Sequence, residues 1–160
     1  MSEYITGVVK GYVAPYVRMT RDGRFSNRAK RYHQSQKALR ASLMEGLARK
    51  QQWRDRILQR PIIDRPIRFG LEVFLPAVKS GPNKGKLPSG GKGGGDYDNY
   101  LKAFLDSAKY SGIIKDDSPR WYRGPCYPPP KGLGVWVPGV YLAKENTPYF
   151  NWVIEVLEEK

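Results

Sequence analysis

The segment from Ile67 to Leu75, Ile-Arg-Phe-Gly-Leu-Glu-Val-Phe-Leu, carries the clearest structural signal in the chain. Every second residue in it is apolar, and alternate side chains of a β-strand lie on the same face. Pro66 and Pro76 stand on either side of the segment, and proline is largely confined to strand ends and edges because it has no N–H to donate. The pattern predicts a strand over residues 67–75 with one face in the core.

Regular elements are expected on both sides of this strand. Residues 4–13 are rich in β-branched and aromatic types, which predicts a first strand. Leucines at every fourth position indicate a long helix from about Asn27 to Trp53. A second helix is expected from Asp98 to about Lys109, because apolar residues recur there at helical spacing. Alternation of apolar residues predicts a final strand from Phe150 to Leu157.

Two segments are expected to lack regular structure. Residues 77–95 contain seven glycines and four lysines, a composition typical of flexible chain. This Lys/Gly loop is either an ordinary insertion or a cationic loop that becomes ordered over a phosphate backbone. Residues 124–148 are rich in proline and aromatic residues and are expected to form an extended loop. Neither segment resembles an interdomain linker, so a single domain over residues 1–160 is expected. The lysines of the Lys/Gly loop are Lys79, Lys84, Lys86 and Lys92.

The charge of the chain indicates a polyanionic partner. Its 160 residues include 28 Lys and Arg against 15 Asp and Glu, a net charge of +13. Residues 1–95 carry +14 and residues 96–160 carry −1. Such a basic surface suits a nucleic acid or an acidic membrane; the alternative is a solvated surface that serves solubility. No apolar run approaches the ~20 residues that span a bilayer, and no basic amphipathic helix carries a bulky apolar face. A nucleic acid is therefore the expected partner, and a membrane is not.

The cysteine and histidine counts exclude several kinds of site. With the single cysteine Cys126, the chain has no internal disulfide and no Cys-rich zinc site. With the single histidine His33, it has no site that needs two or more histidines. Any metal chemistry must therefore use carboxylates, which favour hard ions such as Mg²⁺ or Mn²⁺.

The most informative segment for function is Asp96-Tyr-Asp-Asn-Tyr-Leu-Lys102, followed by Asp116-Asp117. Asp96 and Asp98 stand at the expected start of the second helix, where either can cap it, and Lys102 follows one turn after Asp98. If Asp116-Asp117 comes back beside the start of the helix, three or four carboxylates face one point, and their repulsion favours a bound divalent cation. Carboxylates that hold metal ions, with a lysine beside them, suit phosphodiester hydrolysis.

A basic loop is expected between the first strand and the long helix. Pro15 and the pair Asp22-Gly23 mark it as loop and turn. It holds three arginines that are candidates for phosphate contacts: Arg18, Arg21 and Arg24. The basic side chains of the long helix that follows have two interpretations, a solvated face or a phosphate-facing surface.

The run Asp96-Tyr-Asp-Asn-Tyr-Leu-Lys-Ala-Phe-Leu-Asp106 and the run Gly112-Ile-Ile-Lys-Asp-Asp117 resemble the RusA-type Holliday junction resolvases, a family common in phages and prophages. A looser resemblance covers about residues 4–75. The resemblance implies a small α/β (α+β) domain with a mixed sheet and two main helices. It also implies a homodimer that uses Mg²⁺, with Mn²⁺ as a substitute, to nick opposed strands of a four-way DNA junction. The cytoplasm of a bacterial or phage-infected cell, near the nucleoid, is then the expected location.

The same resemblance assigns roles to individual residues. Asn99 and Asp116 are expected to support the site, and Asp106 is expected at most to pair with Lys102 or Lys109 on the helix. The Lys/Gly loop at 77–95 and the segment 124–148 depart from the family pattern. Three positions match the family's metal-binding aspartates and one its catalytic lysine: Asp96, Asp98, Asp117 and Lys102.

Two other functions remain open on the sequence. One is a non-catalytic nucleic-acid-binding protein, in which the aspartates only cap and solvate a helix. The other is a related nuclease that prefers flaps, forks or other branched DNA. A group of aromatic residues either packs in the core or a dimer interface, or stacks on unpaired bases at the junction centre. They are Trp121, Tyr122, Tyr127, Trp136 and Tyr141.

Overall fold

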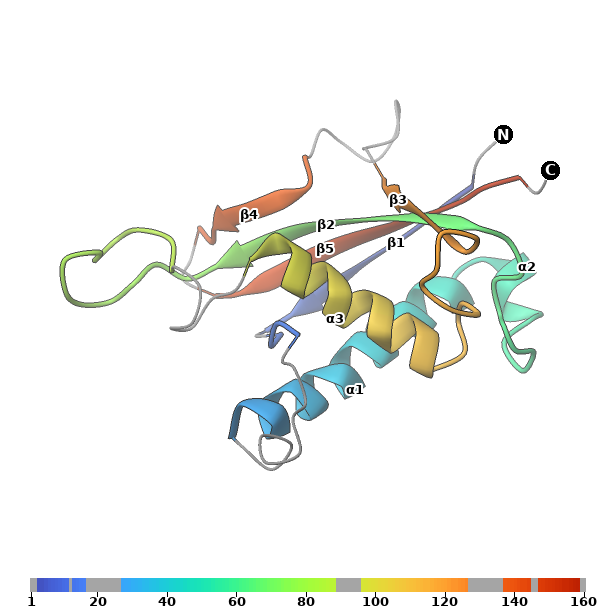
Figure 1. Ribbon diagram of the computed structural model, residues 1–160, viewed down its shortest axis with the longest axis horizontal. Helices are drawn as coiled ribbons and strands as arrows, with labels where there is room; N and C mark the ends of the chain where they lie inside the picture. Colours follow the sequence, from blue (N-terminus) through green and yellow to red (C-terminus); the bar gives the residue numbers. More distant parts are fainter. Residues whose placement is uncertain are drawn as a thin grey trace.

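The described residues form a five-stranded mixed sheet with two long helices on one face (Figure 1). The computed structural model describes residues 3–11, 13–16, 27–88, 96–126, 137–144 and 147–158. The α+β architecture expected from the resemblance is confirmed. In chain order the elements are β1 (Glu3–Lys10), α1 (Asn27–Ala48), α2 (Gln51–Arg54), β2 (Ile67–Leu75), α3 (Tyr97–Tyr110), β3 (Tyr122–Pro125), β4 (Gly139–Leu142) and β5 (Tyr149–Val156).

The strand over 67–75 is confirmed with the predicted bounds, and it lies at the centre of the sheet. On one side β2 pairs antiparallel with β5, which pairs antiparallel with β1. On its other side β2 pairs in parallel with β3 near its start and with β4 near its end. Two short strands therefore share one edge of β2, and a gap separates them around Leu71.

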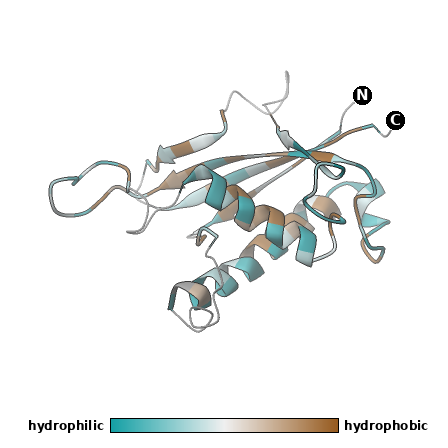
Figure 2. Ribbon diagram, in the orientation of Figure 1, coloured by the Kyte–Doolittle hydropathy of each residue, from teal (hydrophilic) through white to brown (hydrophobic). Residues whose placement is uncertain are grey.

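The core lies between the sheet and the helices. The alternating apolar residues of β2 are all buried, and the two helices pack against them through leucine and phenylalanine side chains such as Leu43 and Phe104. Figure 2 shows α1 and α3 as amphipathic, with hydrophobic and hydrophilic residues alternating along each ribbon. Among the described helices, none is long and apolar enough to cross a membrane. No described helix covers the opposite face of the sheet, which we call the open face (Figure 1).

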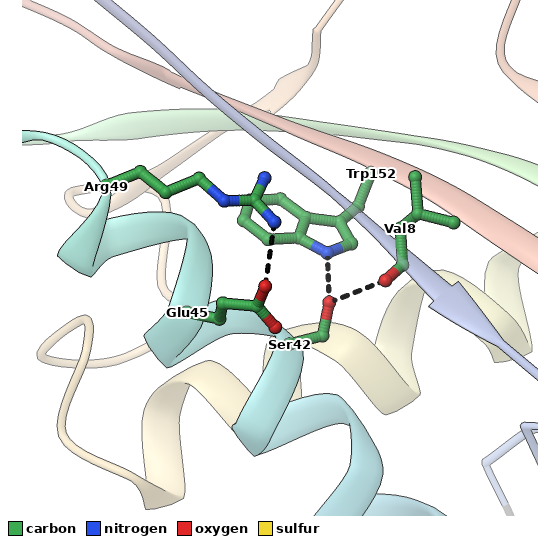
Figure 3. Close-up of polar contacts among 5 residues, drawn as sticks. All are labelled: Val8, Ser42, Glu45, Arg49 and Trp152. Carbon is green, nitrogen blue, oxygen red and sulfur yellow. Dashed lines mark hydrogen bonds and ion pairs between the residues drawn. The ribbon is translucent and has the colours of Figure 1, made fainter.

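The indole of Trp152 on β5 joins the sheet to α1. Its Nε1 donates a 2.8 Å hydrogen bond to Ser42 Oγ, and that hydroxyl donates to the main-chain oxygen of Val8 at 3.2 Å (Figure 3). The ring needs glycine on both sides of it. A Cβ on Gly7 would collide with the indole, and a Cβ on Gly46 would lie 2.5 Å from it. The two glycines therefore let β1 and α1 approach Trp152 closely.

The long helix ends earlier than its apolar spacing predicts. The predicted helix from Asn27 to Trp53 is divided into α1, ending at Ala48, and the short α2. Lys50 between them is extended, with φ −108° and ψ 124°. The break still leaves Trp53 buried in the core. The first strand likewise ends at Lys10, not at residue 13.

Both segments expected to lack regular structure contain ordered parts. Within 77–95, a closed turn forms because Val78 N–H donates to Lys86 O at 2.9 Å and Gly85 N–H donates to Val78 O at 2.9 Å. The prediction of a loop throughout 124–148 is wrong at residues 124 and 125, which end β3, and at Gly139–Leu142, which forms β4 against β2. The short strand has little alternation of its own and depends on its long-range partner. Residues 89–95 and 127–136 lie outside the described residues.

Replacing Gly46 with alanine is expected to destabilise the protein by about 1–3 kcal/mol, because the added methyl overpacks the Trp152 site. In an ordinary helix interior the same change stabilises by about 0.5–1 kcal/mol. Urea denaturation measures the difference. The matched control is Ala41→Gly, an exposed site on the same helix, which should cost about 0.5–1 kcal/mol. A stabilised Gly46→Ala protein would contradict the packing described.

Candidate active site

Asp96 and Asp98 lie at the N-terminus of α3. Asp96 occupies the N-cap position with extended backbone, and its main-chain oxygen accepts from Asn99 N–H at 3.0 Å. Asp96 is therefore at the predicted N-cap position, but its side chain makes no hydrogen bond to the N–H groups of the first turn. Asp98 follows in the first turn, and both residues are exposed. The positive end of the helix dipole favours two carboxylates here.

Tyr97 fixes the start of α3 to the sheet. The hydroxyl of Tyr97 accepts a 3.1 Å hydrogen bond from Leu71 N–H, in the gap between β3 and β4. Burial raises the pKa of Tyr97. Burial also raises the pKa of Tyr122 to about 12, and the nearby Tyr97 and Asp98 add to the effect. Both hydroxyls therefore stay protonated at neutral pH.

Lys102 lies one turn along α3 and points over an aromatic ring. Its Nζ is 3.9 Å from the ring centroid of Tyr16, a cation–π contact worth about 0.5–1 kcal/mol at an exposed site. Tyr16 is itself tied to α3, because its N–H donates to the main-chain oxygen of Asn99 at 3.0 Å. The side chains of Lys102 and Asn99 are exposed on the same helix as the two aspartates. The structure therefore brings four of the predicted site residues together.

Asp117 lies at the other end of α3. Its carboxylate is 3.9 Å from Lys109 Nζ in the last helical turn. Positions 98 and 109 are about 16 Å apart along a helix axis. Asp116 accepts a 2.8 Å hydrogen bond from Ser118 N–H. Hydrogen bonds from the side chain and then the N–H of Ser118 hold the pKa of Asp116 below its usual value. The structure thus does not bring Asp116 and Asp117 back beside Asp96 and Asp98.

Asp106 joins the two long helices. The hydroxyl of Tyr32 on α1 donates to its carboxylate at 2.8 Å, and burial together with this bond raises the pKa of Tyr32. The expected pairing with Lys102 or Lys109 is replaced by this contact between helices. Sequence reasoning missed it because Tyr32 and Asp106 stand 74 positions apart.

The carboxylate pair fits a magnesium ion. Mg²⁺ commonly takes one or two protein carboxylates and completes its shell with water and substrate phosphates. Asp96 and Asp98 are two exposed oxygen donors close together in sequence. In the described part of the chain, no group of three His, Cys, Asp or Glu side chains is placed to hold a metal ion. Within one chain the residues therefore fit a two-carboxylate site, and Asp117 of the same chain lies apart from it, beside Lys109.

The predicted DNA-contacting cations are only partly described. Lys79, Lys84 and Lys86 are exposed on the turn after β2. Of the aromatic group, Trp121 lies under Lys115, whose Nζ is 5.6 Å from the ring. Tyr122 packs against the core, and Tyr141 contacts Phe74, with ring centroids 5.5 Å apart. The remaining predicted residues lie outside the described ranges: Arg18, Arg21, Arg24, Lys92, Tyr127 and Trp136.

A comparison with protein-family models gives a match that covers most of the chain. The model described as endodeoxyribonuclease RusA matches residues 15–119. The matched range includes both long helices, β2 and all the aspartates discussed above. A search of curated proteins finds no match to the chain.

Replacing Tyr97 with phenylalanine is expected to destabilise the protein by about 1–3 kcal/mol, because it leaves the Leu71 N–H buried without its acceptor. The ring is kept, so the loss reports on the hydroxyl. Denaturant unfolding measures it, and hydrogen exchange at Leu71 should quicken. Tyr110→Phe, at an exposed tyrosine of the same helix, is the control and should change stability little. Equal stability of the two variants would show that the hydroxyl does not anchor α3.

Proposed function

Because the chain belongs to the endodeoxyribonuclease RusA family, we propose that it is a Mg²⁺-dependent nuclease that resolves four-way DNA junctions by paired, symmetric nicks. Mn²⁺ is the expected substitute metal. The observation that carries the proposal is the exposed pair Asp96 and Asp98 at the start of α3, with Lys102 one turn away. A protein that only binds DNA needs no such exposed carboxylates on its basic surface, since they repel the phosphates.

Each residue of the site has a defined task in hydrolysis. Asp96 and Asp98 would hold the metal ion, which when bound activates water and offsets charge on the phosphate. The water oxygen bonds to phosphorus as the bond to the leaving strand oxygen breaks, and a proton ends on that oxygen. Lys102 stabilises the negative charge that grows on the phosphate. Tyr16 holds Lys102 near the start of α3, because Nζ of Lys102 lies 3.9 Å from its ring centroid and its N–H is bonded to Asn99 O.

We assign Asp117 to the same reaction through a homodimer. It matches the third aspartate of the family motif, yet it lies beside Lys109, whose position is about 16 Å from that of Asp98 along the helix axis. In a two-fold dimer with α3 helices antiparallel, the partner's Asp117 would complete the site. Two equivalent sites related by a two-fold axis also suit paired incisions in a symmetric junction.

The basic surface supplies the affinity for the substrate. Lys79, Lys84 and Lys86, together with Arg18, Arg21, Arg24 and Lys92, are the proposed phosphate contacts. Such contacts hold branched DNA without reading its sequence. The enzyme is expected to act in the cytoplasm, where bacterial and phage DNA lies.

Asp98→Asn is expected to lower the rate of Mg²⁺-dependent junction cleavage at least about a hundredfold, while junction binding stays within a few fold. A labelled four-way junction, incubated with and without Mg²⁺, measures both. Asp55→Asn, at an exposed carboxylate next to α2, is the control and should cleave normally. Flap and fork substrates in the same assay show which branch is preferred. Wild-type cleavage by Asp98→Asn would remove Asp98 from the site.

Mixing variants tests the assignment of Asp117. Asp98→Asn and Asp117→Asn are each expected to be inactive, but coexpressed chains should form mixed dimers with one intact site. Such dimers should nick one strand and make no paired cuts. Coexpression of Asp98→Asn with the double variant Asp98→Asn, Asp117→Asn is the control and should stay inactive. An inactive first mixture would place Asp117 in the site of its own chain.

A further inference from the structure

Two adjoining cavities lie at the end of the sheet away from the chain termini, on the side of the β1 edge. Their volumes are about 530 and 360 Å³, and they share Val8, Lys144 and Tyr149 as walls. The larger cavity is also bordered by Phe74 and Asn151. We call these two cavities together the open-face pocket. None of the residues that line this pocket is part of the proposed active site.

A row of three aromatic rings crosses the open face and ends at this pocket. The rings of Phe74 on β2 and Tyr149 on β5 are stacked, with centroids 4.3 Å apart and planes 8° from parallel. Tyr141 on β4 continues the row, 5.5 Å from Phe74. On the other side, Tyr149 is paired with Lys10 of β1 in the strand register. Among the described residues, Tyr149 is therefore the last ring of the stack, and it is a wall of both cavities.

The remaining walls carry hydrogen-bonding and cationic groups. Asn151 donates to Glu72 through a 2.9 Å hydrogen bond on the open face, which orients an amide and a carboxylate beside the rings. Lys10 and Lys144 are exposed at the rim. Arg49 reaches from the end of α1 toward Trp152 and is paired with Glu45 at 2.9 Å (Figure 3). The pocket thus combines a stacking surface, polar groups and three cations.

We propose that the open-face pocket binds an unpaired base of single-stranded DNA, stacked on Tyr149 at the end of the aromatic row. The inference rests on the proposed function, because a branched DNA substrate supplies such bases. Base–aromatic stacking is tolerant of sequence, and it is normally combined with cations that follow the backbone. Lys10 and Lys144 stand where they can meet the flanking phosphates. The cavity volume lies within the range of small-molecule sites, which hold ligands of nucleotide size.

The chemistry of the rim favours this occupant over a protein. A protein partner would cover the aromatic row with apolar side chains, and the cations at the rim would then be desolvated without partners at a cost in free energy. The phosphates of a nucleic acid pair with them instead. An occupant with a flat ring and an attached anion satisfies both features at once.

Tyr149→Leu tests the proposal without removing the apolar bulk of the side chain. The probe is a short oligothymidylate with one 2-aminopurine, titrated by fluorescence in the absence of metal. We expect about tenfold weaker binding and loss of the quenching that stacking produces. Tyr110→Leu is the matched control, since Tyr110 is an exposed tyrosine on α3, and it should bind as the wild type does. Thermal unfolding checks that both variants are folded.

Lys144→Ala provides a second variant that leaves the rings unchanged. Its binding should weaken, and the slope of log affinity against log salt should fall by about one. Unchanged affinity and quenching in folded Tyr149→Leu would overturn the proposal, and so would tighter binding of the matching RNA.

Junction cleavage is measured separately. A loss of binding in Tyr149→Leu supports the pocket even if the protein cleaves no junction, whereas cleavage with unchanged binding refutes the pocket alone.

Discussion

The contact on which the rest of the structure depends is the seating of the Trp152 indole between β1 and α1. Gly7 and Gly46 offer no side chain on either side of the ring, and Ser42 accepts its N–H. A buried tryptophan brings a large apolar area, but its N–H needs a partner. The serine on α1 meets that need and connects the helix to the main chain of β1. This contact therefore limits how closely α1 can approach the sheet and how it is rotated.

The position of α1 then determines where α3 lies. Tyr32 on α1 holds Asp106 on α3, and Gln36 donates to the main-chain oxygen of Ala103 at 3.1 Å. At the other end, Tyr97 occupies the gap between the two short parallel strands and accepts from Leu71. Because α3 is held to α1 along its length and to the sheet at its start, its N-terminus presents Asp96 and Asp98 to solvent. A site on a helix held in this way is positioned more rigidly than a site on a loop.

The rigidity of α3 also explains why the acidic residues are divided. A helix of this length keeps its two ends apart, so a motif that begins before α3 and ends after it comes together only if the following chain runs back along the helix. The chain that follows α3 enters β3, which runs parallel to β2 and starts near the beginning of that strand. Asp117 therefore stays beside Lys109. The division is a direct result of the fold, and a symmetric assembly is a simple way to bring the two halves together.

The sequence by itself determined the elements whose pattern is local. The alternation in 67–75 identified β2 with its bounds, helical spacing identified α3 to within one residue at each end, and the run from Asp96 to Asp117 identified the family. Only the tertiary structure decided the contacts between distant positions: Trp152 with Gly46, Tyr97 with Leu71, and Tyr32 with Asp106. It also decided that a short segment near residue 140 becomes a strand and that Asp117 lies away from Asp98. The physical reason is that periodicity reports only which side of an element is apolar. Which partner covers that side depends on the shapes and hydrogen bonds of side chains that meet only after the chain has folded.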